Sequence, residues 1–171
     1  MKDKIRSIEL ALENEIQERN FYLLHSAKTE NPVGKRMFAR IAEDEQEHLV
    51  RLQGIYKELS AQGRWPEHVS AEINNTDIMQ FLVDTVRACG DTETVVSNDC
   101  DAIRIAIAFE TKGYTFYQSL NTAAEAIEEK NFFSRMAAME REHFLSLRET
   151  LLYLEDPAQW FFQQEKPGLE G

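Results

Sequence analysis

Three observations predict an all-α fold for this 171-residue chain, namely a four-helix bundle of two helical hairpins with a long crossover between helices 2 and 3. Apolar residues recur at helical spacing along most of the sequence. Strand signals are absent, and glycine and proline stand mainly at expected turns. The third observation is an internal duplication, because residues of the first half recur 95 positions later in the second half.

The helices follow from this periodicity and from the turn signals between them. The expected elements are a helix over about residues 3–29, a helix over 33–62, a crossover over about 63–98, a helix over 99–123 and a helix over 127–155. Asn31 and Pro32 form a strong turn signal. Asp77 or Thr76 is expected to cap a short crossover helix, and Asp99 to cap the third bundle helix. The sequence thus predicts one bundle domain over 1–156 with its crossover, followed by an aromatic tail over 157–171.

The duplication repeats a set of residues that can bind metal. Each half carries a glutamate and, 30 residues later, a Glu-x-x-His motif; the six residues are Glu15, Glu45 and His48, then Glu110, Glu140 and His143. The glutamate and histidine of each motif share a helix face because they are three residues apart. Apolar residues flank both motifs at helical spacing, so this face is expected to point into the core.

The spacing also places the six side chains at one level of the bundle. With a chain reversal near residue 30, Glu15 and Glu45 both lie roughly 22 Å from the turn. Four buried carboxylates need compensation, because an uncompensated buried charge costs several kcal/mol. Two divalent ions would supply four positive charges. Four glutamates and two histidines are the ligand set of carboxylate-bridged di-iron and di-manganese sites.

Two tyrosines extend this pattern, whereas the remaining histidines do not. Tyr22 and Tyr117 each lie two turns beyond the glutamate of their helix. Each hydroxyl can hydrogen-bond a ligand carboxylate of a neighbouring helix, and each ring can equally be a core aromatic. His25 and His68 are interpreted as surface or packing residues.

The duplicated pattern, with Phe21-Tyr22 and Phe116-Tyr117 downstream, resembles the rubrerythrin branch of the ferritin-like superfamily over nearly the whole chain. The resemblance implies two iron ions per chain. In the isolated protein, zinc or manganese could take their place. Glu45 and Glu140 would bridge the ions, and Glu15 and Glu110 would be terminal ligands. Bacterioferritins share these ligand types, but Gln46 follows Glu45 where those proteins carry a haem-ligating methionine.

The chain departs from the rubrerythrin pattern in two ways. Full-length members carry a rubredoxin module with two Cys-x-x-Cys pairs, whereas only Cys89 and Cys100 are present here, and they cannot build an iron-sulfur centre. An external electron-donor protein is therefore expected. The family's further glutamate on the third helix corresponds to Gly113, and Glu18 on the first helix is a candidate substitute.

The resemblance implies an oxidoreductase that reacts with hydrogen peroxide or O₂ and protects against oxidative stress. Two alternatives use the same ligands: a ferroxidase or iron-storage protein, and a metal-binding structural protein without turnover. The net charge of −11 disfavours nucleic acid and anionic membranes as partners. No signal peptide or bilayer-spanning run is found, and two cysteines suit a reducing compartment, so a cytoplasmic location is expected.

The tail predicts the quaternary state. Trp160, Phe161 and Phe162 are consecutive aromatics that the solvent face of a monomeric bundle does not normally carry. They either fold back over their own bundle or dock on a second subunit. A homodimer is the favoured expectation.

Overall fold

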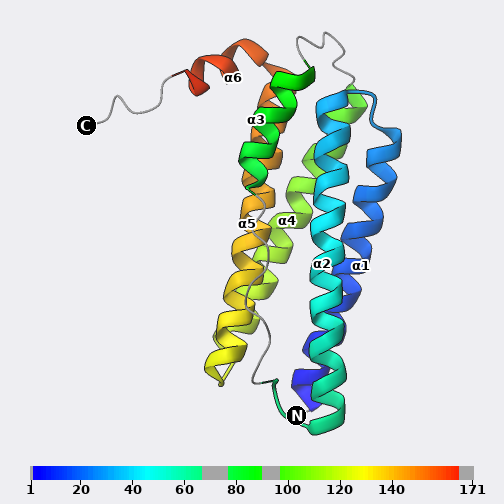
Figure 1. Ribbon diagram of the computed structural model, residues 1–171, viewed down its shortest axis with the longest axis vertical. Coiled ribbons are helices and arrows are strands. Elements are labelled where there is room, and N and C mark those ends of the chain that lie inside the picture. Colours follow the sequence, from blue (N-terminus) through cyan, green and yellow to red (C-terminus); the bar gives the residue numbers. More distant parts are fainter. Residues whose placement is uncertain (1, 67–76, 90–96, 166–171) are drawn as a thin grey trace, which may run out of the picture.

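The structure is a computed structural model that describes residues 2–66, 77–89 and 97–165. Within these ranges it is helical, without strands (Figure 1). The helices are α1 (Lys2–Lys28), α2 (Pro32–Gln62), α3 (Ile78–Cys89), α4 (Ser97–Ala123), α5 (Ile127–Glu155) and α6 (Pro157–Gln164). The four long helices begin and end within two residues of the predicted bounds. None of the described helices is long and apolar enough to cross a bilayer.

The four long helices form a ferritin-like bundle of two hairpins. Helix α1 packs along α2, and α4 packs along α5 (Figure 1). Helices α2 and α4 run in the same direction, so the chain must return to the first end of the bundle between them. The crossover does this, and its helix α3 lies against α2 and α5. The structure confirms the predicted fold class.

Two of the three turn and cap residues predicted from the sequence stand at helix N-termini in the structure. The Asn31 side chain accepts hydrogen bonds from the first backbone N–H groups of α2, and Asp77 accepts one from Gln80 N at 2.9 Å. Thr76 lies outside the described residues. The expected cap at Asp99 is wrong, because α4 begins earlier, at Ser97. The Asp99 carboxylate instead accepts the backbone N–H of Asn31 at 2.8 Å, which ties α4 to the α1–α2 turn.

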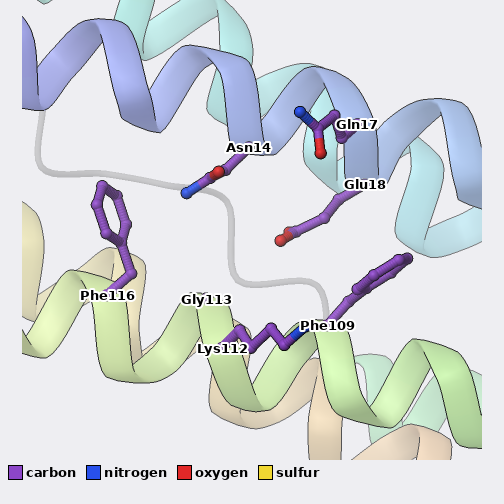
Figure 2. A pocket seen from close by; sticks show the side chains of 7 residues that line it. All are labelled: Asn14, Gln17, Glu18, Phe109, Lys112, Gly113 and Phe116. Atoms are coloured by element: carbon purple, nitrogen blue, oxygen red, sulfur yellow. The ribbon is translucent and has the colours of Figure 1, made fainter.

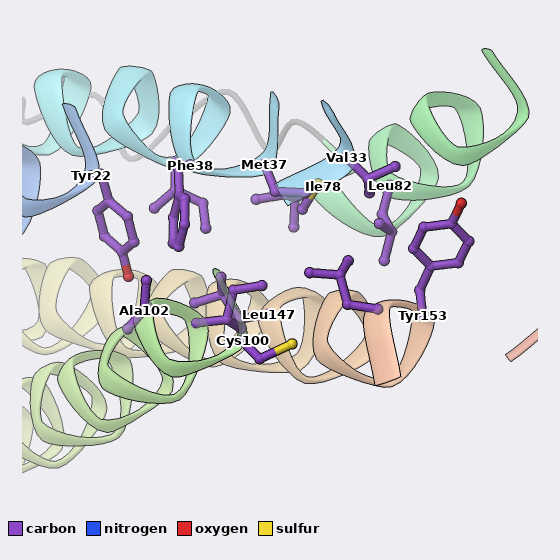
Figure 3. Packing of buried hydrophobic residues seen from close by; sticks show 14 of the residues in the cluster. Tyr22, Val33, Met37, Phe38, Ile78, Leu82, Cys100, Ala102, Leu147 and Tyr153 are labelled. Atoms are coloured by element: carbon purple, nitrogen blue, oxygen red, sulfur yellow. The ribbon is translucent and has the colours of Figure 1, made fainter. Parts of the chain in front are cut away.

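Two apolar clusters fill the bundle, one toward each end. The first includes Met37, Phe38 and Leu82 near the α1–α2 turn (Figure 3). The second includes Leu52 and Phe133 toward the other end. The duplicated glutamates and histidines lie between these clusters along each long helix. The bundle therefore holds a buried polar layer between two apolar layers, which fix its helices on both sides.

The aromatic tail is divided between the core and the surface. Asp156 caps α6, and Trp160 packs edge-on against Tyr153 with ring centroids 5.5 Å apart. Trp160 is 2% exposed and joins the first apolar cluster, so this residue folds back on its own bundle. Phe161 and Phe162 remain 40% and 57% exposed. The homodimer stays a prediction.

Candidate metal centre

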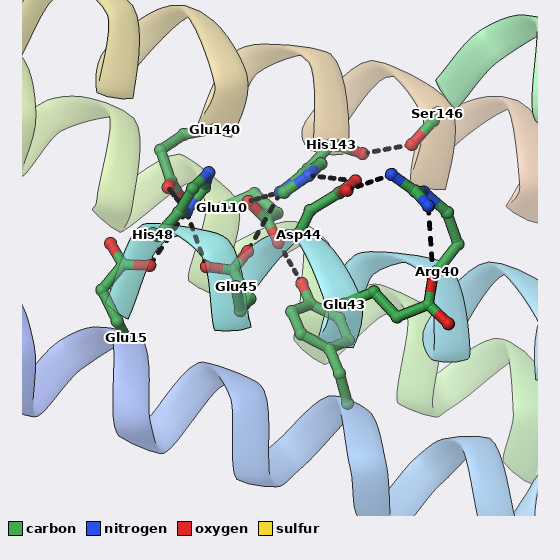
Figure 4. Close-up of polar contacts among 11 residues, drawn as sticks. Glu15, Arg40, Glu43, Asp44, Glu45, His48, Glu110, Glu140, His143 and Ser146 are labelled. Carbon is green, nitrogen blue, oxygen red and sulfur yellow. Dashed lines mark hydrogen bonds and ion pairs between the residues drawn. The ribbon is translucent and has the colours of Figure 1, made fainter. Parts of the chain in front are cut away.

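Each long helix contributes to the buried polar layer (Figure 4). Glutamates on α1 and α4 face the Glu-x-x-His motifs of α2 and α5 because each hairpin turn lies about halfway between the paired positions. All six predicted ligands are at most 2% exposed; they are Glu15, Glu45, His48, Glu110, Glu140 and His143. The structure thus places every one of them in one buried layer.

Four of these side chains form the first ligand group, which contains Glu15, Glu45, His48 and Glu140. One ligand atom from each lies within 4.8 Å of the others. His48 Nδ1 is 3.0 Å from Glu15 Oε2 and 2.9 Å from Glu45 Oε2, and it lies 3.8 Å from Glu140 Oε1. One ring nitrogen therefore faces three carboxylates, as it would around a shared cation.

The second group consists of Glu45, Glu110 and His143. His143 Nδ1 lies 3.1 Å from Glu45 Oε1 and 3.4 Å from Glu110 Oε2. The two imidazole rings are roughly parallel, with centroids 5.9 Å apart. Glu45 belongs to both groups and offers one oxygen to each. It is therefore the carboxylate that is placed to bridge two ions.

The donor atoms fit two divalent cations. Among the described residues, Glu45 Oε1, Glu110 Oε2 and both carboxylate oxygens of Glu140 are buried without a hydrogen-bond donor. Buried carboxylate oxygens without donors are costly, so a positively charged ligand is required to balance them. Carboxylate and imidazole donors together suit iron, manganese and zinc. The fit of the residues to a di-metal centre thus rests on this chain's own atoms.

Without metal, protons must balance the charge. Burial and the neighbouring Glu45 raise the pKa of Glu15 to about 8. Burial opposes protonation of His48, but Glu45 and Glu15 outweigh it and raise the pKa of His48 to about 10. Burial and the surrounding carboxylates also raise the pKa of Glu140 well above its usual range. Burial opposes ionisation of Glu45, yet the adjacent imidazoles hold its pKa well below its usual range.

The two tyrosines connect the hairpins through the ligands. Tyr22 of α1 donates its hydroxyl hydrogen bond to Glu110 Oε1 on α4, and Tyr117 of α4 donates to Glu15 Oε1 on α1. Both rings are buried, and burial, together with the contacted glutamate, raises the pKa of each hydroxyl well above its usual range. The hydroxyls therefore remain donors and hold the outer oxygens of the two glutamates.

Sequence reasoning missed Asp44, which lies 5% exposed beside the second group. Asp44 Oδ2 is 3.4 Å from His143 Nε2, and its other oxygen is 2.5 Å from Arg40 Nη2. The position 95 residues later is Met139, which cannot play the same role toward His48. The sequence did contain a signal for Asp44. An acidic residue directly precedes the ligand Glu45, whereas Met139 precedes Glu140 in the other repeat.

The absence of a side chain at Gly113 leaves room for the carboxylate of Glu140. A Cβ atom at Gly113 would collide with Glu140 Oε2 and lie 3.0 Å from its Cδ. The Glu140 carboxylate thus occupies space that any other residue at position 113 would fill. It belongs to the first ligand group and not to the second. The bridging role expected of Glu140 stays a prediction, because Glu110 of the second group is also among its nearest charged neighbours.

Glu18 and His25 lie outside both ligand groups. Glu18 is 8% exposed, and burial together with Glu45 and Glu110 raises its pKa well above the usual range. His25 packs on Phe21 with ring centroids 4.2 Å apart, as expected of a packing residue. His68 lies outside the described residues.

Comparisons with known proteins agree with this geometry. The Rubrerythrin family model matches residues 7–94 and 101–167. A solved structure of a hypothetical protein from Pyrococcus furiosus aligns with a TM-score of 0.65 and 24% identity, covering 89% of this chain and 90% of that chain. At this identity the likeness shows the fold alone. No match was found among curated proteins.

The family match and the buried carboxylate and imidazole cluster support a di-iron protein. Since the family match spans most of the sequence and both ligand-bearing hairpins, the chain belongs to the rubrerythrin family.

Proposed function

We propose that this protein is a di-iron oxidoreductase that reduces hydrogen peroxide, or O₂ as a slower substrate, and so protects against oxidative stress. The observation that carries the proposal is the pair of ligand groups that share Glu45. A carboxylate shared by two groups would hold two ions side by side, and paired ions of this kind can act together on one small molecule.

In this proposal each of the two ligand groups binds one ion. Glu15, His48 and Glu140 hold one ion together with Glu45. Glu110 and His143 would hold the other ion, also together with Glu45. Iron in these positions would supply one electron from each ion, which is the number needed to cleave the oxygen–oxygen bond of peroxide.

The surrounding residues orient the ligands and exclude water. Tyr22 and Tyr117 donate to Glu110 and Glu15, so these carboxylates keep their inner oxygens for the ions. Asp44 accepts from His143 Nε2, which leaves Nδ1 of that ring as the metal-facing atom. The apolar clusters keep bulk water from the two ends of the layer.

The electrons must return from outside the centre. Cys89 and Cys100 are free thiols, Cys100 buried, and neither lies in a ligand group. We therefore propose an external electron-donor protein. Free thiols also support a proposed reducing, cytoplasmic location.

The proposal is tested by loading metal-free protein anaerobically with two Fe²⁺ per chain and mixing it with hydrogen peroxide or with O₂ in a stopped-flow spectrometer. Rapid single oxidation of both irons by peroxide, with slower oxidation by O₂, is the expected result. Sustained oxidation of many iron equivalents by O₂ would favour the ferroxidase or storage alternative. Reaction with neither oxidant would leave a structural metal site.

Two variants provide the controls. Glu45→Gln removes the shared carboxylate and should abolish the fast oxidation. Glu47→Gln is the matched control, because Glu47 lies on the same helix two positions later and in neither ligand group. An equal loss of rate in both variants would contradict the assignment of Glu45.

A further inference from the structure

A pocket of about 310 Å³ lies between α1 and α4, beside the metal centre. Three pairs of its lining residues are related by the 95-residue offset of the duplication: Asn14 with Phe109, Gln17 with Lys112 and Glu18 with Gly113. The pocket therefore lies where the two repeats of the chain face each other. That position is equivalent for both halves of the bundle.

The lining residues range from exposed to buried. Gln17 and Lys112 are exposed, and Asn14 and Phe109 are half-buried. Glu18 and Gly113 are buried, and the Glu18 carboxyl group points from α1 toward α4 (Figure 2). The pocket thus runs from solvent toward the interior of the bundle.

The inner end of the pocket adjoins the ligands. Glu18 is 8% exposed and lies one helical turn after the proposed ligand Glu15, near enough to the ligand carboxylates for them to raise its pKa. Gly113 has no side chain, and the space beyond its Cα is taken by the Glu140 carboxylate. At this point no side chain of α4 stands between the pocket lining and a proposed ligand.

The lining fits a small uncharged molecule. At the buried end, the raised pKa of Glu18 favours its neutral carboxyl group, and Asn14 and Gln17 add amide groups that donate and accept hydrogen bonds. The volume exceeds that of a water molecule in the liquid, about 30 Å³, several times over. Hydrogen peroxide, with two oxygens and two donor hydrogens, has the size and chemistry that this pocket accepts.

We propose that the α1–α4 pocket is the port through which the small oxidant reaches the metal centre, with Gln17 and Lys112 at its mouth and Glu18 and Gly113 at its inner end. This inference rests on the proposed function and adds the route and the residues that control it. The competing route is the groove between α4 and α5, of about 500 Å³, which is lined by the proposed ligand Glu110 and by Thr111. That groove lies within one tightly packed hairpin, whereas the port lies between hairpins.

The test blocks each route and measures ligand access rather than turnover. Gln17→Trp and Asn14→Phe place bulky rings at the mouth and middle of the port. Thr111→Trp is the matched control, because it adds the same bulk at an exposed position of the α4–α5 groove. Each iron-loaded protein is checked for metal content and melting temperature. It is then mixed anaerobically with nitric oxide, a small uncharged ligand of ferrous iron, and the binding rate is recorded by absorbance.

Both port variants should keep their iron and their melting temperature and bind nitric oxide about tenfold more slowly, while Thr111→Trp binds at the wild-type rate. Unchanged rates in both port variants, or slowing in Thr111→Trp alone, would overturn the port. Slower nitric oxide binding in the port variants of a protein that does not react with peroxide would support the port and contradict the peroxidase. A wild-type chain that takes up no iron would overturn the proposed function and the inference with it.

Discussion

Removing the metal should make the stability of the protein fall as pH rises from 5 to 7. The pKa of Glu15 is about 8 in the folded metal-free chain, against 4.5 for the unfolded reference. Between these values the folded state keeps a proton that the unfolded state releases, so the free energy of unfolding decreases with pH. One proton corresponds to about 1.4 kcal/mol per pH unit, which gives roughly 2 to 3 kcal/mol across this window.

Other groups act in the same direction. The raised pKa of Glu140 adds a second cost as pH rises. His48, with a pKa of about 10, contributes stability that is complete below about pH 6.5 and is lost as pH rises toward 10. The contribution of Glu15 alone corresponds to roughly 5 to 10 °C in melting temperature for a chain of this size.

The assay is thermal unfolding of chelator-treated protein, followed by circular dichroism at pH 5, 6 and 7. Glu15→Gln is the control, because the amide does not titrate and should remove the share of the slope due to Glu15. Metal-loaded protein should be more stable than metal-free protein at pH 7, since a ligand of the native state stabilises it. A metal-free melting temperature that does not change with pH, or a variant with the wild-type slope, would refute the reasoning.

Four further predictions concern single features. Glu45→Ala should lower the metal content from two ions per chain, and full loading by elemental analysis would show that the ligand assignment is wrong. Tyr117→Phe loses a hydroxyl that orients a ligand carboxylate and should weaken metal binding about tenfold by calorimetry; unchanged affinity would make the ring a packing residue. Gly113→Ala puts a Cβ atom where the Glu140 carboxylate lies, so the displaced carboxylate should weaken metal binding in calorimetry; equal affinity would show that the displacement is harmless. Replacing Phe161 and Phe162 together by serine should weaken the expected homodimer in sedimentation, and an unchanged dimer would place its interface elsewhere.

The helices and the ligand layer were predictable because they depend on periodicity. Helix bounds followed from apolar spacing, and the depth of Glu15 and Glu45 followed from their equal distance to the turn at Asn31. Three-residue spacing placed His48 beside Glu45. These features depend on the geometry of single helices, which the sequence specifies locally.

Features that depend on contacts between helices were not predictable. Asp99 looked like a cap of its own helix but binds the backbone of Asn31, 68 positions away. Asp44 reaches a histidine of another hairpin, and Glu140 takes up the space left by Gly113. Each case required knowing which helices meet, and at what distance.

The most direct test of the account is a crystal structure of the iron-loaded protein with anomalous diffraction measured at the iron absorption edge. The account predicts two iron peaks per chain, about 3.5 to 4 Å apart, with Glu45 in contact with both. One peak should contact the first ligand group, Glu15, His48 and Glu140, and the other the second group, Glu110 and His143. A single peak, or peaks away from these residues, would contradict the di-metal centre.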